Sequence, residues 1–347
     1  MTEPQLHVDL DAFAANIAVV RARIAPARLM LIVKDDAYGH GLAPIVRRAA
    51  AEGVRWFGAF DVREALRTRA VVGPGPRIFS WLTVGQDQIH AALTADIDLG
   101  VGDAGFLDDI AAASRTAGVP ARVHVKIDTG LHRNGIRPEE WDSLLARARS
   151  FSDAGLVRVV GVWSHIAEAS DREDDDARAV FETAVAAAET AGFDLEVRHL
   201  SASAASFARP EFRYDLARVG AFCYGIRPAG GPDEDELGIR PIASLVAPVT
   251  HVGDYAVTLG IGSLHGLPST LAQHAALEVA PHRAQITQIS ETHTVVASRE
   301  GAGFGAEVTV FGPQGTSATD LAEAIGTVGE EILVRVSPLV ARRYLGE

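Results

Sequence analysis

Five polar side chains stand at or just beyond the ends of short apolar runs, and their types suit covalent and acid–base chemistry. They are Lys34, Arg133, His165, Ser203 and Arg218. A lysine amine condenses with aldehydes and, once free and neutral, accepts protons. Hydroxyl and guanidinium groups donate hydrogen bonds to bound anions. A lone lysine, arginine or histidine would be an ordinary surface or core residue, but five in equivalent positions indicate one site.

The apolar runs themselves predict eight strands that alternate with helices. Because the runs are almost continuously apolar, the strands are expected to be parallel and buried on both faces. Eight such units predict an α/β fold, a (β/α)8 TIM-like barrel, in which active sites lie at the carboxyl ends of the strands. The predicted strands are Leu29–Val33, Trp56–Phe60, Arg77–Trp81, Ile97–Val101, Ala121–Ile127, Val157–Trp163, Leu195–Leu200 and Leu216–Phe222, and the predicted helices include Pro44–Gly53, Gln86–Ala95, Phe106–Gly118 and Asp174–Gly192.

An open, doubly wound parallel sheet is the alternative arrangement of these units. Such a sheet normally carries a glycine-rich loop after its first strand. The segment from Lys34 to Gly39 reads Lys-Asp-Asp-Ala-Tyr-Gly, which is not a loop of that kind. The barrel is therefore the preferred prediction.

A change of composition near Pro228 predicts that residues 1–228 form the barrel and residues 229–347 a smaller, mostly-β C-terminal domain. The glycine-containing segment Ala229–Pro232 is followed by four acidic residues, as in a linker or an exposed loop. Beyond it, runs of β-branched residues predict strands. These are Ala256–Ile261, Ala284–Ile289, Thr294–Ala297, Glu307–Phe311 and Ile332–Val336, with one short helix over Asp320–Ile325.

The overall composition narrows the possible classes of protein. The net charge of −13 argues against a general nucleic-acid or membrane-surface partner, because both require clustered positive charge. The single cysteine, Cys223, excludes an intramolecular disulfide and lies in an apolar run. The N-terminus has no basic and apolar regions typical of a signal peptide, and no apolar run would span a bilayer. We expect a cytoplasmic protein without a metal site.

The residues around the candidate site resemble segments of the alanine racemase family. Residues Val33–Gly41 read Val-Lys-Asp-Asp-Ala-Tyr-Gly-His-Gly, similar to the cofactor-lysine segment of that family, with Asp35 in place of its usual alanine. The segment Lys126–Arg133 is similar to the Lys-x-Asp-Thr-Gly-Met-x-Arg segment of the family. Further similar segments are Ser164-His165, His199–Ala205, Arg218–Gly220 with Tyr224-Gly225, Asp320–Ala322 and Glu331–Pro338.

The resemblance implies pyridoxal 5'-phosphate as the cofactor and an amino acid as the small-molecule substrate. It implies that Lys34 holds the cofactor as a Schiff base and, when a substrate amine displaces it, acts as a base. It assigns the cofactor phosphate to Tyr38, Ser203 and the backbone amides of Gly220 and Ala221. Amide and hydroxyl donors are well suited to phosphate.

The resemblance also assigns residues to the cofactor ring. It places Arg133 near the phenolic oxygen, His165 near the ring, where it orients Arg218, and Arg218 against the pyridine nitrogen. An always-charged arginine disfavours protonation of that nitrogen, which weakens the electron sink and suppresses transamination. Lys126 matches a lysine that is often carbamylated in the family.

The C-terminal domain departs from the family at the position of its second base. In the family this base is a tyrosine that the β domain of a partner subunit supplies, which implies a homodimer. Here Ser263 replaces the tyrosine, and His265 replaces the aspartate two residues later. A serine hydroxyl is a poor base at neutral pH, whereas a histidine can titrate there. Further departures are Leu267, Ala202, the shortened segment between Val252 and Leu259, and Gln288-Ile289-Ser290.

Three functions remain open for this sequence. The first is an amino-acid racemase, a pyridoxal-phosphate-dependent isomerase of D-amino acid metabolism, with Lys34 as one base and His265, Tyr255 or water as the other. The second is another reaction of the same cofactor, such as decarboxylation, elimination or a retro-aldol step, that uses Lys34 alone. The third is a cofactor-binding protein with little turnover. The racemase is preferred because an arginine at the ring nitrogen suits it.

Overall fold

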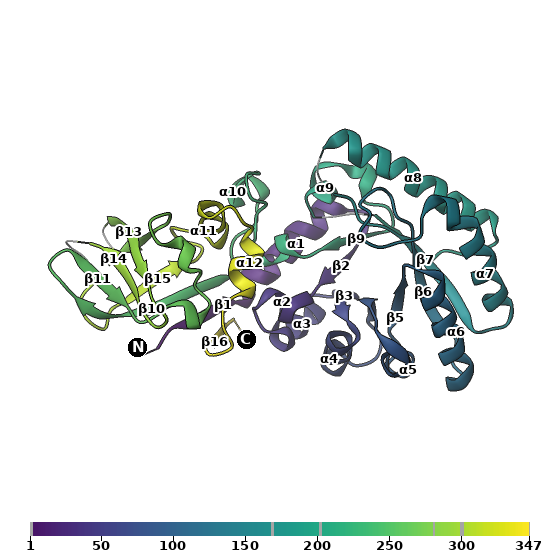
Figure 1. The fold of residues 1–347 in the computed structure, drawn as a ribbon, viewed down its shortest axis with the longest axis horizontal. Helices are drawn as coiled ribbons and strands as arrows, with labels where there is room; N and C mark the ends of the chain where they lie inside the picture. Colours follow the sequence, from purple (N-terminus) through teal and green to yellow (C-terminus); the bar gives the residue numbers. More distant parts are fainter. Residues whose placement is uncertain (1–2, 168–169, 201–202, 280–281, 299–301, 347) are drawn as a thin grey trace. The chain divides into compact units, whose positions relative to one another are not determined.

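The protein is described by a computed structural model that covers residues 3–167, 170–200, 203–279, 282–298 and 302–346 (Figure 1). Its chain divides into two compact units. The barrel unit consists of Val20–Lys34 and Ala49–Gly220. The β unit consists of Met1–Val19, Asp35–Arg48 and Ala221–Glu347. The chain passes between the units within helices α1 (Leu10–Ile24) and α3 (Leu42–Ala51), at α2 (Lys34–Tyr38), and between Gly220 and Ala221.

The barrel unit contains an eight-stranded parallel sheet in the order β8-β7-β6-β5-β4-β3-β2-β9. The Asp215 amide, just before β9, donates to the Arg198 carbonyl in β8 over 3.3 Å, so the two end strands lie side by side and nearly close the sheet. This confirms the predicted TIM-like barrel over the open sheet, together with all eight predicted strands. They are β2 (Arg28–Ile32), β3 (Trp56–Asp61), β4 (Arg77–Leu82), β5 (Asp98–Val101), β6 (Ala121–Lys126), β7 (Val157–Trp163), β8 (Val197–His199) and β9 (Leu216–Val219).

Helices of the barrel unit surround these strands (Figure 1). Several begin at side-chain caps, in which Asp61, Asp103 and Ser170 accept a backbone N–H of the first turn. Strands such as β5 are buried at every position, which agrees with their apolar sequence. The helices are α4 (Val62–Val72), α5 (Gly85–Thr94), α6 (Ala104–Ala117), α7 (Trp141–Asp153), α8 (Asp171–Thr190) and α9 (Ser203–Ala208), with short 3-10 turns η1 (Pro138–Glu140) and η2 (Pro210–Phe212).

The β unit is built on a second sheet in the order β12-β13-β14-β11-β10-β1-β16, with β15 paired to β10. Its pairs are antiparallel except for β1 and β16. The strands are β1 (Gln5–Asp9), β10 (Ala243–Val252), β11 (Ala256–Leu259), β12 (Ala276–Val279), β13 (His282–Ile289), β14 (Thr294–Ala297), β15 (Glu307–Phe311) and β16 (Ala341–Leu345), and the helical segments are η3 (Ala221–Tyr224), α10 (Glu234–Leu237), η4 (Ser263–His265), η5 (Ser269–Leu271), α11 (Ala318–Ala324) and α12 (Gly329–Val334).

One predicted strand in this unit is wrong. The run Ile332–Val336 was predicted to be a strand, but most of it belongs to helix α12. Ile332, Leu333 and Val336 are buried while Val334 and Arg335 between them are exposed, which is helical rather than alternating periodicity. The other four predicted strands and the short helix are present. Strands β1, β10, β12 and β16 were not predicted, and the domain boundary after residue 228 stays a prediction.

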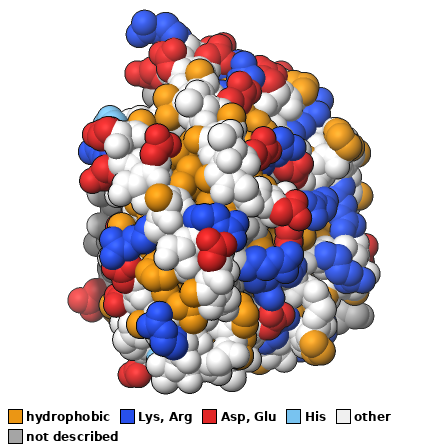
Figure 2. All heavy atoms as spheres, turned by 90° about the vertical axis from the view of Figure 1, so that its right-hand side faces the viewer, with side chains coloured by type: hydrophobic (Ala, Val, Ile, Leu, Met, Phe, Trp, Pro, Cys, Tyr) orange, Lys and Arg blue, Asp and Glu red, His pale blue; other side chains and the backbone are white. Residues whose placement is uncertain are grey.

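No helix in the described ranges is long and apolar enough to cross a membrane. Figure 2 shows one face of the molecule, on which acidic and basic side chains are interspersed.

A left-handed turn follows strand β2 directly after Lys34. Asp35, Asp36, Ala37 and Tyr38 all have φ between 54° and 57°. This conformation is uncommon for residues with a Cβ, and such strain concentrates at functional sites. The turn closes with a bond from the Gly39 amide to the Asp35 carbonyl over 2.8 Å. The backbone just beyond Lys34 is therefore held in a conformation that the surrounding structure must stabilise.

Gly39 ends this turn and packs closely against the backbone of the β unit. Its φ is +79°, and an added Cβ would lie 2.6 Å from the Leu333 carbonyl oxygen. Gly39→Ala should therefore lower the free energy of unfolding by about 2–5 kcal/mol, the sum of left-handed strain and overpacking. Gly238, in the same unit, has φ +72° but an added Cβ would be 3.7 Å from its nearest neighbour, Val19. Gly238→Ala should cost only about 1–2 kcal/mol. If urea titrations gave equal losses of unfolding free energy for Gly39→Ala and Gly238→Ala, the close packing at Gly39 would be contradicted.

Candidate active site

The predicted barrel residues gather at the carboxyl ends of the strands. Lys34 lies two residues beyond β2, His165 two residues beyond β7, and Arg218 is the third residue of the four in β9. Ser203 begins α9 after β8, and Arg133 lies in the loop after β6. Because the strands are parallel, these ends share one end of the barrel. The structure thus brings together the five residues with which the sequence argument began.

Arg218 is a buried cation whose two terminal nitrogens meet acceptors on β8 and in the segments that follow β7 and β8. One nitrogen, Nη1, donates to His199 Nδ1 over 2.8 Å and to the His199 carbonyl over 2.9 Å. The other, Nη2, donates to the Ser164 carbonyl over 2.6 Å and lies 3.4 Å from His165 Nδ1. Burial lowers the pKa of Arg218 to about 9, so it stays protonated at neutral pH. The guanidinium is therefore fixed in both position and charge.

The pKa of His165 indicates the electrostatic character of the site. Burial, followed by the charges of Arg218, Arg133, Lys126 and Lys34, lowers its pKa to about 3. The imidazole is therefore neutral at neutral pH. Four positive groups act on one half-buried ring, so the site is strongly electropositive. An anionic ligand would complement it.

Lys126 is a buried amine beside an aromatic ring. Its Nζ lies 4.6 Å from the centre of the Trp163 ring, and the Arg218 guanidinium lies 5.3 Å from the same ring. Burial, then the charges of Arg133 and Arg218, lowers the pKa of Lys126 to about 8, with Asp128 opposing. The sequence contains two lysines, Lys34 and Lys126, and both lie at this end of the barrel.

Asp128 shapes the loop that carries Arg133. Its carboxylate accepts the amides of Gly130 and His132 over 3.1 and 3.0 Å, and it lies 2.9 Å from His132 Nδ1. His132 has φ 54°, which these bonds stabilise. Arg133 follows on the exposed side of the loop. The backbone of the loop therefore sets the position of Arg133. The charge of Arg133 contributes to lowering the pKa of both Lys126 and His165.

Ser203 and Gly220 form a pair of donors at the same end of the barrel. The Gly220 amide donates to Ser203 Oγ over 3.5 Å, which is long for a hydrogen bond. A weak bond of this length leaves both groups able to turn toward a bound oxygen anion. Ala202, one of the predicted departures from the family, lies outside the described residues.

Three predicted site residues belong to the β unit instead. Tyr38 follows Lys34 by four residues, and its ring packs against Tyr224 at 4.9 Å between centroids. Ala221 follows Gly220 and begins η3. His265 lies in η4, far along the chain from both.

The loop around His265 is closed by hydrogen bonds. The Gly262 amide donates to His265 Nδ1 over 3.0 Å, and the His265 carbonyl accepts the Ser337 amide over 3.0 Å. The Ser263 amide donates to the Ser290 carbonyl over 2.9 Å, so two of the segments predicted to depart from the family meet. Because Nδ1 accepts a backbone amide, the neutral imidazole carries its proton on Nε2. Burial and then His293 also lower the pKa of His265, against Glu3.

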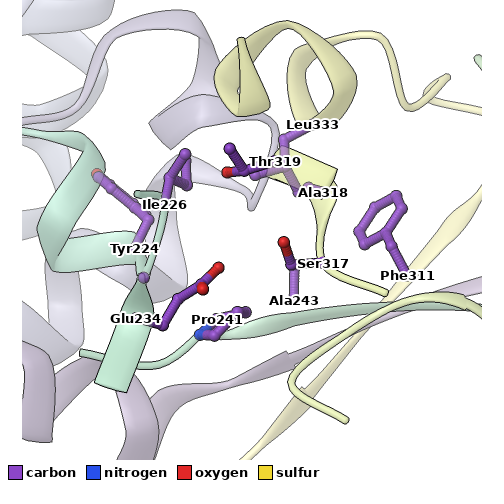
Figure 3. A pocket seen from close by; sticks show the side chains of 11 residues that line it. Tyr224, Ile226, Glu234, Pro241, Ala243, Phe311, Ser317, Ala318, Thr319 and Leu333 are labelled. Atoms are coloured by element: carbon purple, nitrogen blue, oxygen red, sulfur yellow. The ribbon is translucent and has the colours of Figure 1, made fainter. Parts of the chain in front are cut away.

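A small pocket in the β unit lies apart from these residues. Its lining includes Glu234, Phe311, Ser317 and Thr319, whose side chains are drawn in Figure 3. None of the predicted site residues lines it. Within the described residues, no cluster of three or more histidine, cysteine or acidic side chains could hold a metal ion.

Sequence reasoning missed two polar residues inside the barrel. His124 and Asp98 are fully buried and hydrogen-bonded to each other over 3.2 Å. His124 stands two residues before Lys126 in β6, a spacing that puts both side chains on one face of the strand. This two-residue spacing from Lys126 was the sequence feature that could have identified His124. Asp98 sits at the first position of β5 and carried no comparable signal.

The chain is similar to known proteins over nearly its whole length. Residues 8–228 match the family model described as alanine racemase, N-terminal domain. The alanine racemase of Beutenbergia cavernae is 38% identical, over 98% of this chain and 97% of the relative. The alanine racemase of Thermobifida fusca is 34% identical, over 99% and 98%.

Solved structures show the same likeness. The alanine racemase from D-cycloserine-producing Streptomyces lavendulae is 33% identical with a TM-score of 0.95, covering 100% of this chain and 98% of that structure. The alanine racemase from Streptomyces coelicolor A3(2) is 32% identical with a TM-score of 0.96, covering 99% and 98%.

The lowered pKa of Lys126 predicts that its amine reacts with carbon dioxide. At pH 8 about half of the Lys126 amine is neutral, and a neutral amine adds to carbon dioxide and releases one proton, giving a carbamate. Protein in 13C-bicarbonate at pH 8 should show one slowly exchanging carbamate carbon by NMR. The signal should vanish in Lys126→Arg and persist in Lys34→Arg. A signal that survives in Lys126→Arg, or none in the native protein, would contradict the prediction.

Proposed function

The chain belongs to the alanine racemase family, and from this we propose that it is a pyridoxal-5'-phosphate-dependent amino-acid racemase that interconverts L- and D-amino acids. One observation carries the proposal. Lys34 lies at the same barrel end as Arg218, His165, Arg133 and Lys126, where an amine is surrounded by fixed positive charge. That arrangement suits a lysine that binds an anionic aldehyde.

The residues present fit the cofactor by their chemistry. Pyridoxal phosphate carries a phosphate and an ionisable phenolic oxygen, and the electropositive barrel end complements both. Ser203 and the Gly220 amide are donors suited to the phosphate. The resemblance adds Tyr38 and the Ala221 amide. Lys34 would bind the aldehyde carbon, and Arg133 would face the phenolic oxygen.

Lys34 is proposed to move the substrate proton. When bound, the cofactor withdraws electrons from the substrate Cα, which makes its proton removable. A substrate amine that displaces Lys34 frees its Nζ, which can then take a proton from one face of Cα or return it there. Lys34 thus serves one enantiomer directly.

Arg218 is proposed to face the pyridine nitrogen as a donor. It remains charged at neutral pH because its pKa, although lowered by burial, is about 9. A charged donor disfavours protonation of the nitrogen it faces. This limits electron withdrawal, so that the proton returns to Cα instead of entering side reactions. His165, which is neutral, lies against Arg218 and helps to hold it.

The opposite face of Cα is where this chain departs from its relatives. Ser263 is exposed, and a hydroxyl without an assisting base accepts protons poorly at neutral pH. The His265 Nδ1 lone pair is already used by the Gly262 amide, so His265 could accept a proton there only by breaking that bond. Tyr255, in the turn between β10 and β11, and water are the other candidates. We therefore propose that the second proton transfer is slow.

We also propose a homodimer in which the β domain of each partner subunit completes the site. In such a pair the loop with Ser263 and His265 would face the barrel end of the partner subunit. Two-fold symmetry is the common arrangement for pairing of this kind.

The proposed function predicts unequal treatment of the two enantiomers. Cofactor-loaded protein is incubated in deuterium oxide with L-alanine or with D-alanine, and loss of the Cα proton and formation of the opposite enantiomer are followed. One enantiomer should exchange about 10²–10⁴-fold faster than the other, because loss of a positioned base typically costs that factor. Racemisation should proceed at the slower rate, and Lys34→Ala should abolish both.

A matched pair of variants locates the missing base. Ser263→Tyr should raise exchange of the slower enantiomer, whereas Ser269→Tyr, at another exposed serine of the same unit, should not. Fast and equal exchange of both enantiomers by the native protein would mean that another residue is the second base. Release of carbon dioxide or ammonia would favour a different reaction of the cofactor. Absence of exchange with any amino acid would leave only cofactor binding.

A further inference from the structure

Four buried polar side chains form a continuous line of hydrogen bonds inside the barrel. Arg218 Nη1 lies 2.8 Å from His199 Nδ1, His199 Nε2 lies 2.9 Å from His124 Nδ1, and His124 Nε2 lies 3.2 Å from Asp98 Oδ2. His199, His124 and Asp98 are fully buried, and Arg218 is 7% exposed. We propose that Asp98, His124 and His199 position Arg218 through this chain of hydrogen bonds. In the chain, here called the relay, every donor lies on the Arg218 side of its acceptor.

The direction of the relay follows from the chemistry of its two ends. A guanidinium has only donors, so His199 Nδ1 must accept from Arg218. The proton of His199 is then on Nε2, which donates to His124 Nδ1. The proton of His124 is likewise on Nε2, which donates to Asp98, and an ionised carboxylate only accepts. Each imidazole is thereby restricted to a single tautomer.

The charge states of the members agree with this direction. Burial lowers the pKa of His199 well below its ordinary value, with Arg218 and His124 adding to the effect. Burial also lowers the pKa of His124, against its bond to Asp98. Burial would raise the pKa of Asp98, but His124, Arg77 and Arg122 outweigh it and the net shift is downward. The relay therefore joins a carboxylate to a guanidinium through two neutral rings.

Asp98 is anchored at the opposite end of the strands from Arg218. It is the first residue of β5, whereas Arg218 lies near the carboxyl end of β9. The Asp98 carboxylate accepts from Arg122 Nε over 2.6 Å and from Arg77 Nε over 3.0 Å. Arg77 also bonds to Glu196 over 2.8 Å. The relay thus ties the position of Arg218 to a fixed ion-pair cluster.

The barrel interior leaves room for the relay and holds its rings. At Gly161, beside His124 in the neighbouring strand, an added Cβ would lie 2.7 Å from His124 Nδ1. The Trp163 ring stacks on His199 with an interplanar angle of 9°, and its Nε1 donates to the His124 carbonyl over 3.1 Å. Phe79 packs against both imidazoles. Neither ring can turn over without displacing these neighbours.

Asp98 and His124 are therefore positioning residues that act through Arg218. The relay is a property of the barrel interior alone. Its consequence for the reaction rests on the proposed function, in which Arg218 faces the cofactor ring. If His199 took the other tautomer, its Nδ1 would carry a proton and could no longer accept from Arg218. A substitution of His124 would therefore change the hydrogen bonding of Arg218 through His199.

Nitrogen NMR of the native protein tests the relay without any variant. Protein labelled with 15N at histidine should show His199 and His124 as neutral rings protonated on Nε2. A through-bond correlation should join His199 Nε2 to His124 Nδ1 across the hydrogen bond. Protonation of either ring on Nδ1, or of His199 on both nitrogens, would overturn the proposal.

Two variants of His124 then separate the two halves of the relay. His124→Asn places an oxygen near the position of Nδ1, so His199 keeps an acceptor. His124→Gln places an amide donor near the position of Nε2, so Asp98 keeps a donor but His199 loses its acceptor. In His124→Gln the His199 Nε2 proton should exchange with solvent about tenfold to a hundredfold faster than in His124→Asn, as expected for loss of one buried hydrogen bond.

The outcomes of this comparison are distinct. Faster exchange of the His199 Nε2 proton in His124→Gln than in His124→Asn supports the relay. Equal exchange rates in the two variants, or faster exchange in His124→Asn, would show that His124 only fills space, and would overturn it. In cofactor-loaded enzyme, kcat should fall further in His124→Gln than in His124→Asn, with a smaller change in KM. If the protein racemises no amino acid, the proposed function fails, while the NMR result still decides the relay.

Discussion

Arg218 is a charged group buried in the barrel, and its neighbours supply the hydrogen-bond acceptors that this charge requires. A buried charge without hydrogen-bond partners would destabilise the fold by several kcal/mol. Here the carbonyls of Ser164 and His199 and the ring of His199 accept its protons. Burial, followed by this charge, lowers the pKa of His165 and keeps the ring neutral, and burial, followed by Arg133 and then Arg218, lowers the pKa of Lys126. Arg218 thus contributes to the charge states of its neighbours at this end of the barrel.

The two units differ in what they contribute to the proposed chemistry. The barrel unit carries Lys34, the electropositive surroundings and the donors suited to a phosphate. The β unit carries Ser263, at the position where the resemblance to the family implies a tyrosine, in a loop closed on Ser290 and Ser337 by backbone bonds. Under the proposed function, the barrel supplies the first base and the second proton transfer is slow. Family membership and the rate of racemisation are therefore separate questions.

The barrel could be predicted because eight apolar runs of strand length recur between helices, a pattern that few folds produce. The β unit was harder, because short β-branched runs do not distinguish strands from helices. Ile332–Val336 was predicted as a strand, yet its buried residues follow helical spacing. Strand β1 pairs with β10 and β16, which lie far away in the chain, and no local signal marks such a pairing.

Sequence reasoning proposed site residues where motifs are local, and it missed buried polar residues whose arrangement depends on distant contacts. Lys34, His165 and Arg218 each lie in a short recognisable segment. The relay joins Asp98, His124 and His199 from three strands, and a single buried histidine in a sequence resembles any core residue. The left-handed turn after Lys34 was also not predicted, because Asp, Ala and Tyr do not require a positive φ.

The central claim is that Lys34 carries the cofactor, and reduction followed by peptide mapping tests it most directly. Borohydride reduces the carbon–nitrogen double bond that a lysine forms with the cofactor aldehyde, which makes the attachment permanent. The chain offers two lysine amines, Lys34 and Lys126, so the measurement has a built-in comparison. The account predicts the added phosphopyridoxyl mass only on the peptide that contains Lys34. A phosphopyridoxyl group on Lys126, or none on either lysine in cofactor-saturated protein, would contradict it.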